Sequence, residues 1–245
     1  MMKRLLVLFG CLLVSSAFGE NREESLRAAI KKLKLPGVHI NLDERCVDVD
    51  AEVCLHSGSL ELLVCSKNTK EHESIVMTPA KGMHIHTALL LLGAKAGHPA
   101  IRKVVDEESG GRWIDIPPRG AKVTVFLVIK GENGEMNERP INDFIHSLVD
   151  VEENQPRKFP TNTFVFAGSH LVDAEEGPKK YMADGSGNII SLSTFGDELL
   201  CFPSVNTHDN GGLIWEVNSE GLPKVGTKVT LRLRPELNKG APKGK

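Results

Sequence analysis

Hydrophobic and polar residues alternate with a period of two along much of the chain, a pattern that predicts β-strands with one buried face. The clearest example is "CVDVDAEV" at residues 46–53, where valine and alanine occupy one face and Cys46, Asp48 and Asp50 occupy the other. The same reasoning predicts further strands at residues 38–42, 60–65, 73–78, 121–131, 161–169, 213–217 and 227–234.

Two segments have the character of helices. Residues 23–33 place Leu26, Ile30 and Leu33 on one side, and a proline soon after them stops the helix. Residues 80–94 are apolar nearly all round, which predicts a buried helix. Few helices among many strands make the expected fold class α+β: a β-rich single domain of mainly antiparallel strands, with one buried helix and an N-terminal amphipathic helix.

Three stretches are harder to assign. Residues 179–195 read as a β-hairpin around the turn "GSGN". Residues 143–153 fit either a strand or a helix, and residues 95–119 are rich in turn formers without a clear period.

The first 19 residues have the three parts of a secretory signal peptide. Lys3 and Arg4 make a positive start, a short apolar run follows, and the small residues Ala17 and Gly19 precede the expected cleavage. The run is too short to span a bilayer as a helix. "LFGC", which ends at Cys11, resembles a lipoprotein signal, but the bulky residue before its glycine fits poorly. We therefore expect an exported chain, periplasmic or secreted, without a lipid anchor.

No shift in composition marks a linker within the mature chain. We expect a helix or linker at residues 20–34, one domain at residues 35–235 and a flexible tail at residues 236–245.

Cleavage after residue 19 leaves 28 basic and 32 acidic residues, a net charge near −4. This balance excludes the basic surface that is typical of a nucleic-acid-binding protein. No other stretch is long and apolar enough to cross a membrane, so we expect no transmembrane segment in the mature chain. The sequence does not identify a partner.

The cysteines that remain after cleavage are Cys46, Cys54, Cys65 and Cys201. An even number in an oxidising compartment predicts at least one disulfide, worth about 2–4 kcal/mol of stability. Three pairings are open. In a simple hairpin through residues 57–59, Cys54 would face Glu61, so a bridge from Cys54 to Cys65 would need a bulge or a longer loop.

The densest group of metal-ligand residue types consists of Glu71, His72 and Glu73, followed by His84 and His86. Imidazole and carboxylate together suit zinc or another divalent metal. Two histidines two residues apart can share an ion on a strand, but on a helix they point about 200° apart. We also expect the helix to begin beside the acidic segment, with Glu71 or Glu73 at its positive end.

Other reactive residue types lack the context that their chemistry needs. Ser74 and Ser169 fall outside the G-x-S-x-G pattern of acyl-transfer nucleophiles. "ADGSGN" at residues 183–188 and "HDNGG" at residues 208–212 read as turns that could hold a ligand. No H-E-x-x-H motif supports a zinc protease.

Several strings together resemble the YdjY-domain family of exported bacterial proteins: "VCLHSGSLELLVCSKNTKEHESIV", "HIHTALLLLGAKAGHP", "FVFAGS", "ADGSGNIISL" and "GTKVTLRLRP". The resemblance covers roughly residues 35–235. It implies a single exported domain and brings no assigned activity, cofactor or catalytic residue. The family pattern often places proline before the H-x-H helix, where this chain has Gly82.

Two hypotheses on function follow. The first is an exported non-catalytic binding or structural module for a ligand that the sequence does not identify. The second is a metal-dependent, hydrolase-like enzyme, which requires at least three side chains of the His/Glu cluster to reach one point. We favour the first.

The exported protein should begin at Glu20, because small residues follow the apolar run at the positions that signal peptidase recognises. Mass spectrometry of the exported form measures this directly. A retained Met1 or a lipid on Cys11 would contradict it.

Overall fold

The computed structural model describes residues 25, 27–30, 32–106, 111–131, 133–152, 155–206 and 214–237. The chain divides into two units at Pro36, and the second, Pro36–Lys245, holds every strand described below. The signal peptide, residues 23, 24, 26 and 31 of the predicted N-terminal helix and nearly all of the predicted tail lie outside the described residues.

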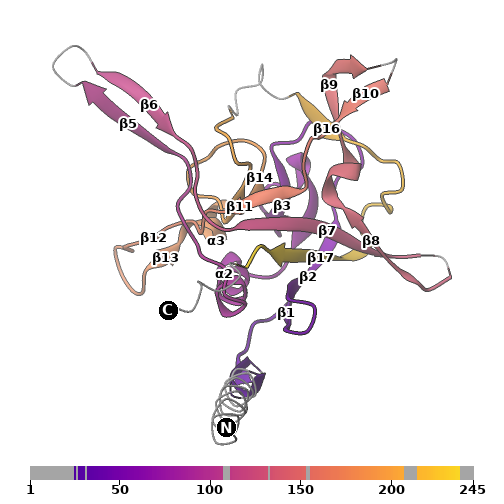
Figure 1. The fold of residues 1–245 in the computed structure, drawn as a ribbon, viewed down its shortest axis with the longest axis horizontal. Helices are drawn as coiled ribbons and strands as arrows, with labels where there is room; N and C mark the ends of the chain where they lie inside the picture. The colour runs from indigo at the N-terminus through magenta and orange to yellow at the C-terminus, as the bar shows by residue number, and fades with distance from the viewer. Residues whose placement is uncertain are drawn as a thin grey trace, which may run out of the picture. The chain divides into compact units, whose positions relative to one another are not determined.

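The largest sheet among the described residues has ten strands: β1 (Val38–Asn41), β2 (Cys46–Val53), β3 (Leu62–Ser66), β4 (Ser74–Thr78), β7 (Lys122–Lys130), β8 (Met136–Pro140), β11 (Thr163–Phe166), β14 (Asn188–Ser191), β15 (Leu200–Cys201) and β17 (Lys228–Pro235). Eight of them form a closed barrel in the order β2, β17, β7, β11, β15, β14, β3 and β4, with β4 pairing again to β2 (Figure 1). β1 and β8 pair with β2 and β7. The prediction of a β-rich domain with few helices is confirmed, and the closed barrel is new.

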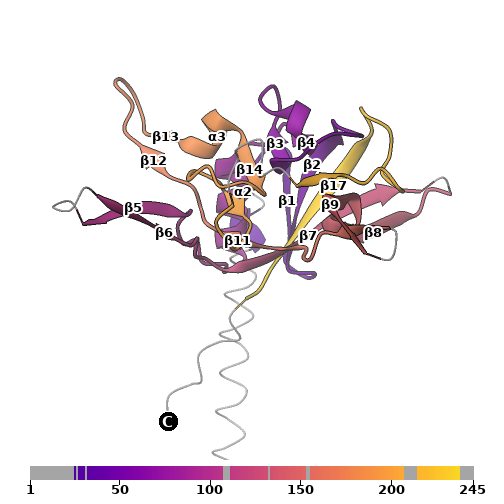
Figure 2. The same cartoon turned by 90° about the horizontal axis from the view of Figure 1, so that it is seen from above.

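Smaller elements surround the barrel: β5 (Ile101–Asp106) with β6 (Arg112–Ile116), β9 (Ile145–Glu152) with β10 (Gln155–Lys158) and β16 (Trp215–Val217), β12 (Leu171–Val172) with β13 (Lys180–Tyr181), the helices α2 (Gly82–Leu91) and α3 (Met182–Ser186), and the 3-10 turns η1 (Glu71–Glu73) and η2 (Ile141–Phe144). The β5–β6 hairpin extends away from the barrel in both views (Figures 1 and 2). No helix among the described residues is long and apolar enough to cross a membrane.

The apolar face of β2 is buried inside the barrel, as the alternation in the sequence predicts. Val47, Val49 and Val53 are fully buried, while Asp50 between them is exposed. The neighbouring strand β17 meets this face in antiparallel register, and Leu231 lies opposite Val49. Each such fully buried aliphatic side chain contributes roughly 1.5–3 kcal/mol through removal of apolar surface from water.

The outward face of the same two strands carries an ion-pair network. The Arg232 guanidinium donates two hydrogen bonds of 2.7 Å to the Asp48 carboxylate and a third of 2.8 Å to Glu138. Arg234 donates to the same Glu138 at 2.8 Å. These charge-assisted bonds tie β2, β17 and β8 in one register from the outside.

Strand β4 completes the barrel and sets the path of the chain before it. It pairs with β3 in parallel and with β2 in antiparallel orientation. Two neighbouring parallel strands need a connection that returns to the same end of the sheet. Residues 67–73, which include η1, make this connection.

Helix α2 confirms the predicted buried helix, although it is shorter than residues 80–94. It packs against β1, β2 and α3. Ile85, Ala88 and Leu89 are fully buried, whereas Leu90 is 47% exposed. The helix therefore has one outward face that the sequence pattern does not reveal.

Two local predictions are wrong. The hairpin at residues 179–195 is instead the short helix α3, which ends at Gly187 in the left-handed conformation (φ 82°), followed by β14, which pairs with β3 and β15. β2 and β3 do not form a simple hairpin either, because both pair with β4. The ambiguous segment at residues 143–153 becomes the end of η2 followed by β9.

Three backbone segments cross closely at residues 95–97, residues 119–121 and Phe166 of β11. The Gly97 amide donates to the Phe166 carbonyl at 3.0 Å, and the Ala121 amide donates to the Lys95 carbonyl at 2.8 Å. A Cβ atom on Gly97 would lie 1.9 Å from the Arg119 carbonyl oxygen, and one on Gly120 would lie 1.9 Å from the Phe166 carbonyl oxygen. Only glycine fits at these two positions without moving backbone.

Substitution Gly97→Ala should lower the free energy of unfolding by about 3 kcal/mol, because the added methyl group meets backbone that cannot rotate away. The matched control is Gly185→Ala in α3, where an added Cβ meets nothing within 4 Å and helix propensity favours alanine. Chemical denaturation of the two variants tests this; equal stabilities would contradict the close crossing.

Candidate functional site

The acidic half of the predicted metal cluster lies in the η1 crossover. The Glu71 carboxylate accepts a hydrogen bond from the Asn68 amide. The Glu73 carboxylate lies 3.6 Å from the Lys70 ammonium and 3.7 Å from the His72 imidazole, whose side chain is 77% exposed. Glu71 and Glu73 thus have partners within their own turn.

The two histidines of the cluster lie on α2 and have different surroundings. The His86 Nδ1 donates to the Tyr181 hydroxyl at 2.9 Å, and that hydroxyl donates to the Gly168 carbonyl at 3.0 Å. The ring also packs edge-on against Phe166. Burial lowers the pKa of His86, so its imidazole is neutral at physiological pH. The Nδ1 of His84 is buried and has no hydrogen-bond partner among the residues that the structure describes.

The N-terminus of α2 is hydrogen-bonded to a carboxylate from a different element than the one that the sequence predicts. The Met83 amide donates to the Asp184 carboxylate of α3 at 3.4 Å. The prediction of Glu71 or Glu73 at this helix end is therefore wrong. Asp184 satisfies the same physical need, because a helix N-terminus attracts negative charge.

The described residues contain no group of three or more His, Cys, Asp or Glu side chains placed to hold one metal ion. The structure places His72 at the surface and joins His86 to Tyr181. Zinc or other divalent-metal binding by Glu71, His72, Glu73, His84 and His86 stays a prediction.

The two serines are held by local hydrogen bonds. The Ser74 hydroxyl donates to the Lys70 carbonyl at 2.8 Å. The Ser169 hydroxyl donates to the Asp197 carbonyl at 2.5 Å and accepts from the Ala183 amide at 3.0 Å. These bonds anchor loops, and neither involves a histidine base. The "HDNGG" segment lies outside the described residues.

All four cysteines are thiols in the structure, so the predicted disulfide stays a prediction. The Cys54 thiol donates to the Ser74 carbonyl at 3.1 Å. Cys54 and Cys65 lie beside each other near β4, and their interaction lowers the pKa of Cys65. The same interaction raises the pKa of Cys54. Burial raises the pKa of Cys46 to about 11 and also raises that of Cys201.

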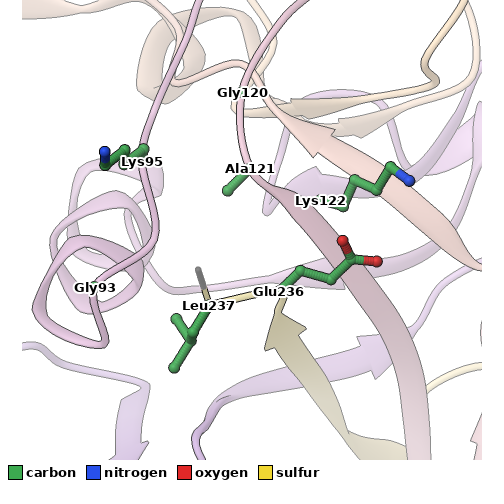
Figure 3. Close-up of a pocket in the computed structure, with 7 residues that line it drawn as sticks. All are labelled: Gly93, Lys95, Gly120, Ala121, Lys122, Glu236 and Leu237. Atoms are coloured by element: carbon green, nitrogen blue, oxygen red, sulfur yellow. The ribbon is translucent and has the colours of Figure 1, made fainter. Parts of the chain in front are cut away.

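A pocket of about 450 Å³ opens beside the close backbone crossing (Figure 3). Its lining comes from the turn after α2, the segment before and into β7, and the residues that follow β17: Gly93, Lys95, Gly120, Ala121, Lys122, Glu236 and Leu237. Figure 3 shows Lys122 and Glu236 on one side of the pocket, Gly93, Lys95 and Leu237 on the other, and Ala121 between the two lysines, whose ammonium groups point away from each other. The volume lies in the range of small-molecule sites, roughly 300–1,000 Å³.

Backbone hydrogen bonds hold the pocket wall in place. The Glu236 amide donates to the Lys122 carbonyl at 2.7 Å, and the Ala121 carbonyl accepts from the Phe166 amide at 2.8 Å. Gly120 needs its positive φ of 153° to pass under Phe166. The charged side chains are exposed, but the backbone that carries them is fixed at several points.

Sequence reasoning missed this pocket. Its residues come from three distant segments, and Gly93, Gly97 and Gly120 are ordinary turn signals when each is seen alone. The one available signal is the tripeptide Gly-Ala-Lys, which occurs at residues 93–95 and again at residues 120–122 and does not by itself distinguish a pocket from a turn.

The fold and pocket define the class as a closed β-barrel domain with extra helices and hairpins on its outside. A family model described as the YdjY domain matches residues 38–234, and the chain belongs to this family. The predicted resemblance is confirmed. No curated protein and no solved structure matches the chain.

The buried His86 should make the protein less stable in mild acid. Its folded pKa lies below the unfolded value of 6.5, so the unfolded chain binds the proton more readily. Stability should therefore be full above pH 6.5 and fall as the pH drops through the folded pKa. His86→Gln should flatten this part of the profile, while the exposed control His72→Gln should leave it unchanged. Thermal unfolding across the pH range measures this; an unaltered acid slope in His86→Gln would count against it.

Proposed function

We propose that this protein is an exported, non-catalytic binding module that holds a small molecule in the pocket beside the backbone crossing. The observation that carries the proposal is the pocket itself, about 450 Å³ in volume and lined from three segments. Backbone hydrogen bonds and close glycine contacts fix its wall, so binding would cost little ordering of the chain.

Three features support a role in binding over one in catalysis. The hydroxyls of Ser74 and Ser169 are engaged with backbone groups. The imidazole of His86 is engaged with Tyr181. The pocket lining contains lysine and glutamate but no serine, threonine, cysteine or histidine, which are common nucleophiles and bases of acyl-transfer sites.

Export is part of the same proposal. Its support is the signal-peptide pattern of the first 19 residues, and the family match agrees with a single domain at residues 38–234. In an oxidising compartment Cys54 and Cys65 are the pair of choice for the predicted disulfide, because their thiols interact. The pocket lies on other strands and does not depend on that bond.

The branched alcohol 3-methylbutan-1-ol, an uncharged probe, should enter the pocket and shift the backbone amide signals around Gly120 in an NMR titration of the mature chain. Ala121→Leu should abolish the response, because the larger side chain occupies the part of the pocket that Ala121 lines. Ala121→Ser, which leaves the pocket open, is the matched control. Amide shifts spread over the whole surface, or the same response in Ala121→Leu, would contradict the proposal.

A further inference from the structure

The charged side chains that line the pocket indicate which charges a ligand could have. Lys95 and Lys122 bring two ammonium groups and Glu236 brings one carboxylate. None of these three takes part in an ion pair among the residues that the structure describes. The lining therefore presents charges of both signs that no side chain of the described structure neutralises.

The turn after α2 lies on the other side of the pocket. Figure 3 shows Gly93 of this turn on the side of Lys95, across the pocket from Glu236. The last carbonyl groups of α2 accept hydrogen bonds from the amides of Leu92, Gly93 and Ala94. Glu236 is therefore the group of the lining that suits a ligand ammonium.

The remaining surface of the pocket is apolar. Figure 3 shows Ala121 between the two lysines and Leu237 on the side of Gly93. An aliphatic group placed there would leave water and gain roughly 25 cal/mol for each Å² of buried surface. A cation site, an anion site and an apolar site thus lie within one volume of about 450 Å³.

We propose that the pocket binds a zwitterion with an aliphatic side chain, the chemistry of an apolar α-amino acid or of a short peptide made from such residues. The ligand carboxylate contacts Lys95 or Lys122, its ammonium group contacts Glu236, and its side chain lies against Ala121 and Leu237. This inference rests on the proposed binding function and names the class of ligand for the same pocket.

The test uses four probes that share one branched tail: leucine, 4-methylpentanoate, 3-methylbutylamine and 3-methylbutan-1-ol. The first carries both charges, the next two carry one each, and the last carries none. Isothermal titration and NMR on the mature chain should rank leucine first. Loss of either charge should weaken binding about threefold or more, the effect of one exposed ion pair.

Charge-removing variants assign each group to its partner. Glu236→Gln should weaken leucine and 3-methylbutylamine but not 4-methylpentanoate. At least one of Lys122→Gln and Lys95→Gln should weaken the binding of leucine and 4-methylpentanoate, and neither should weaken that of 3-methylbutylamine. Lys130→Gln is the matched control, because it removes the same charge from the far end of β7 and should change nothing.

The possible failures are distinct. If the alcohol or a singly charged probe binds in the pocket as tightly as leucine, the zwitterion proposal is wrong and the binding function stands. If none of the four probes shifts the amides around the pocket, the proposed function itself is wrong. The full pattern of probes and variants described above would support both.

Discussion

The barrel depends on one strand, β4, which pairs with β2 on one side and β3 on the other. Without it the sheet would have two open edges, and exposed edges invite pairing with other chains. The Cys54 amide donates to the Ile75 carbonyl at 3.0 Å next to this closure. The buried strand side chains then face a sealed interior, in which Val53 and Val76 lie opposite each other and are fully buried.

The same closure explains the position of the most reactive-looking sequence. β3 and β4 are parallel neighbours, so the chain must cross back within residues 67–73. Glu71, His72 and Glu73 form the turn of that crossover and pair with residues of the turn itself. Their density in the sequence has a local structural cause, whether or not a metal binds there.

The sequence predicted strands and a helix whose hydrophobic pattern reflects one buried face. It did not predict which strands pair with each other. The alternation in β2 and β17 and the apolar run of α2 are properties of single segments, so they could be read directly. The parallel pairing of β3 with β4 could not be read, because a period of two does not indicate which strand lies next to it.

The arm formed by β5 and β6 was missed for a different reason: Trp113 and Ile114 are adjacent and both exposed, so no single face is buried. Gly187 was read as a hairpin turn, since glycine serves helix ends and turns equally well. The pocket was missed because the close approach of Gly97 to Arg119 is a tertiary contact between residues that each look like part of a loop.

The closed barrel of this protein holds a pre-formed pocket wall. Native-state amide hydrogen exchange tests this most directly at two reporters: the Cys54 amide at the closure and the Gly97 amide, which donates to the Phe166 carbonyl beneath the pocket. Both should exchange only through global unfolding, with the same free energy that denaturation measures. Rapid exchange of Gly97 through local opening, or of Cys54 through release of β4, would contradict the claim.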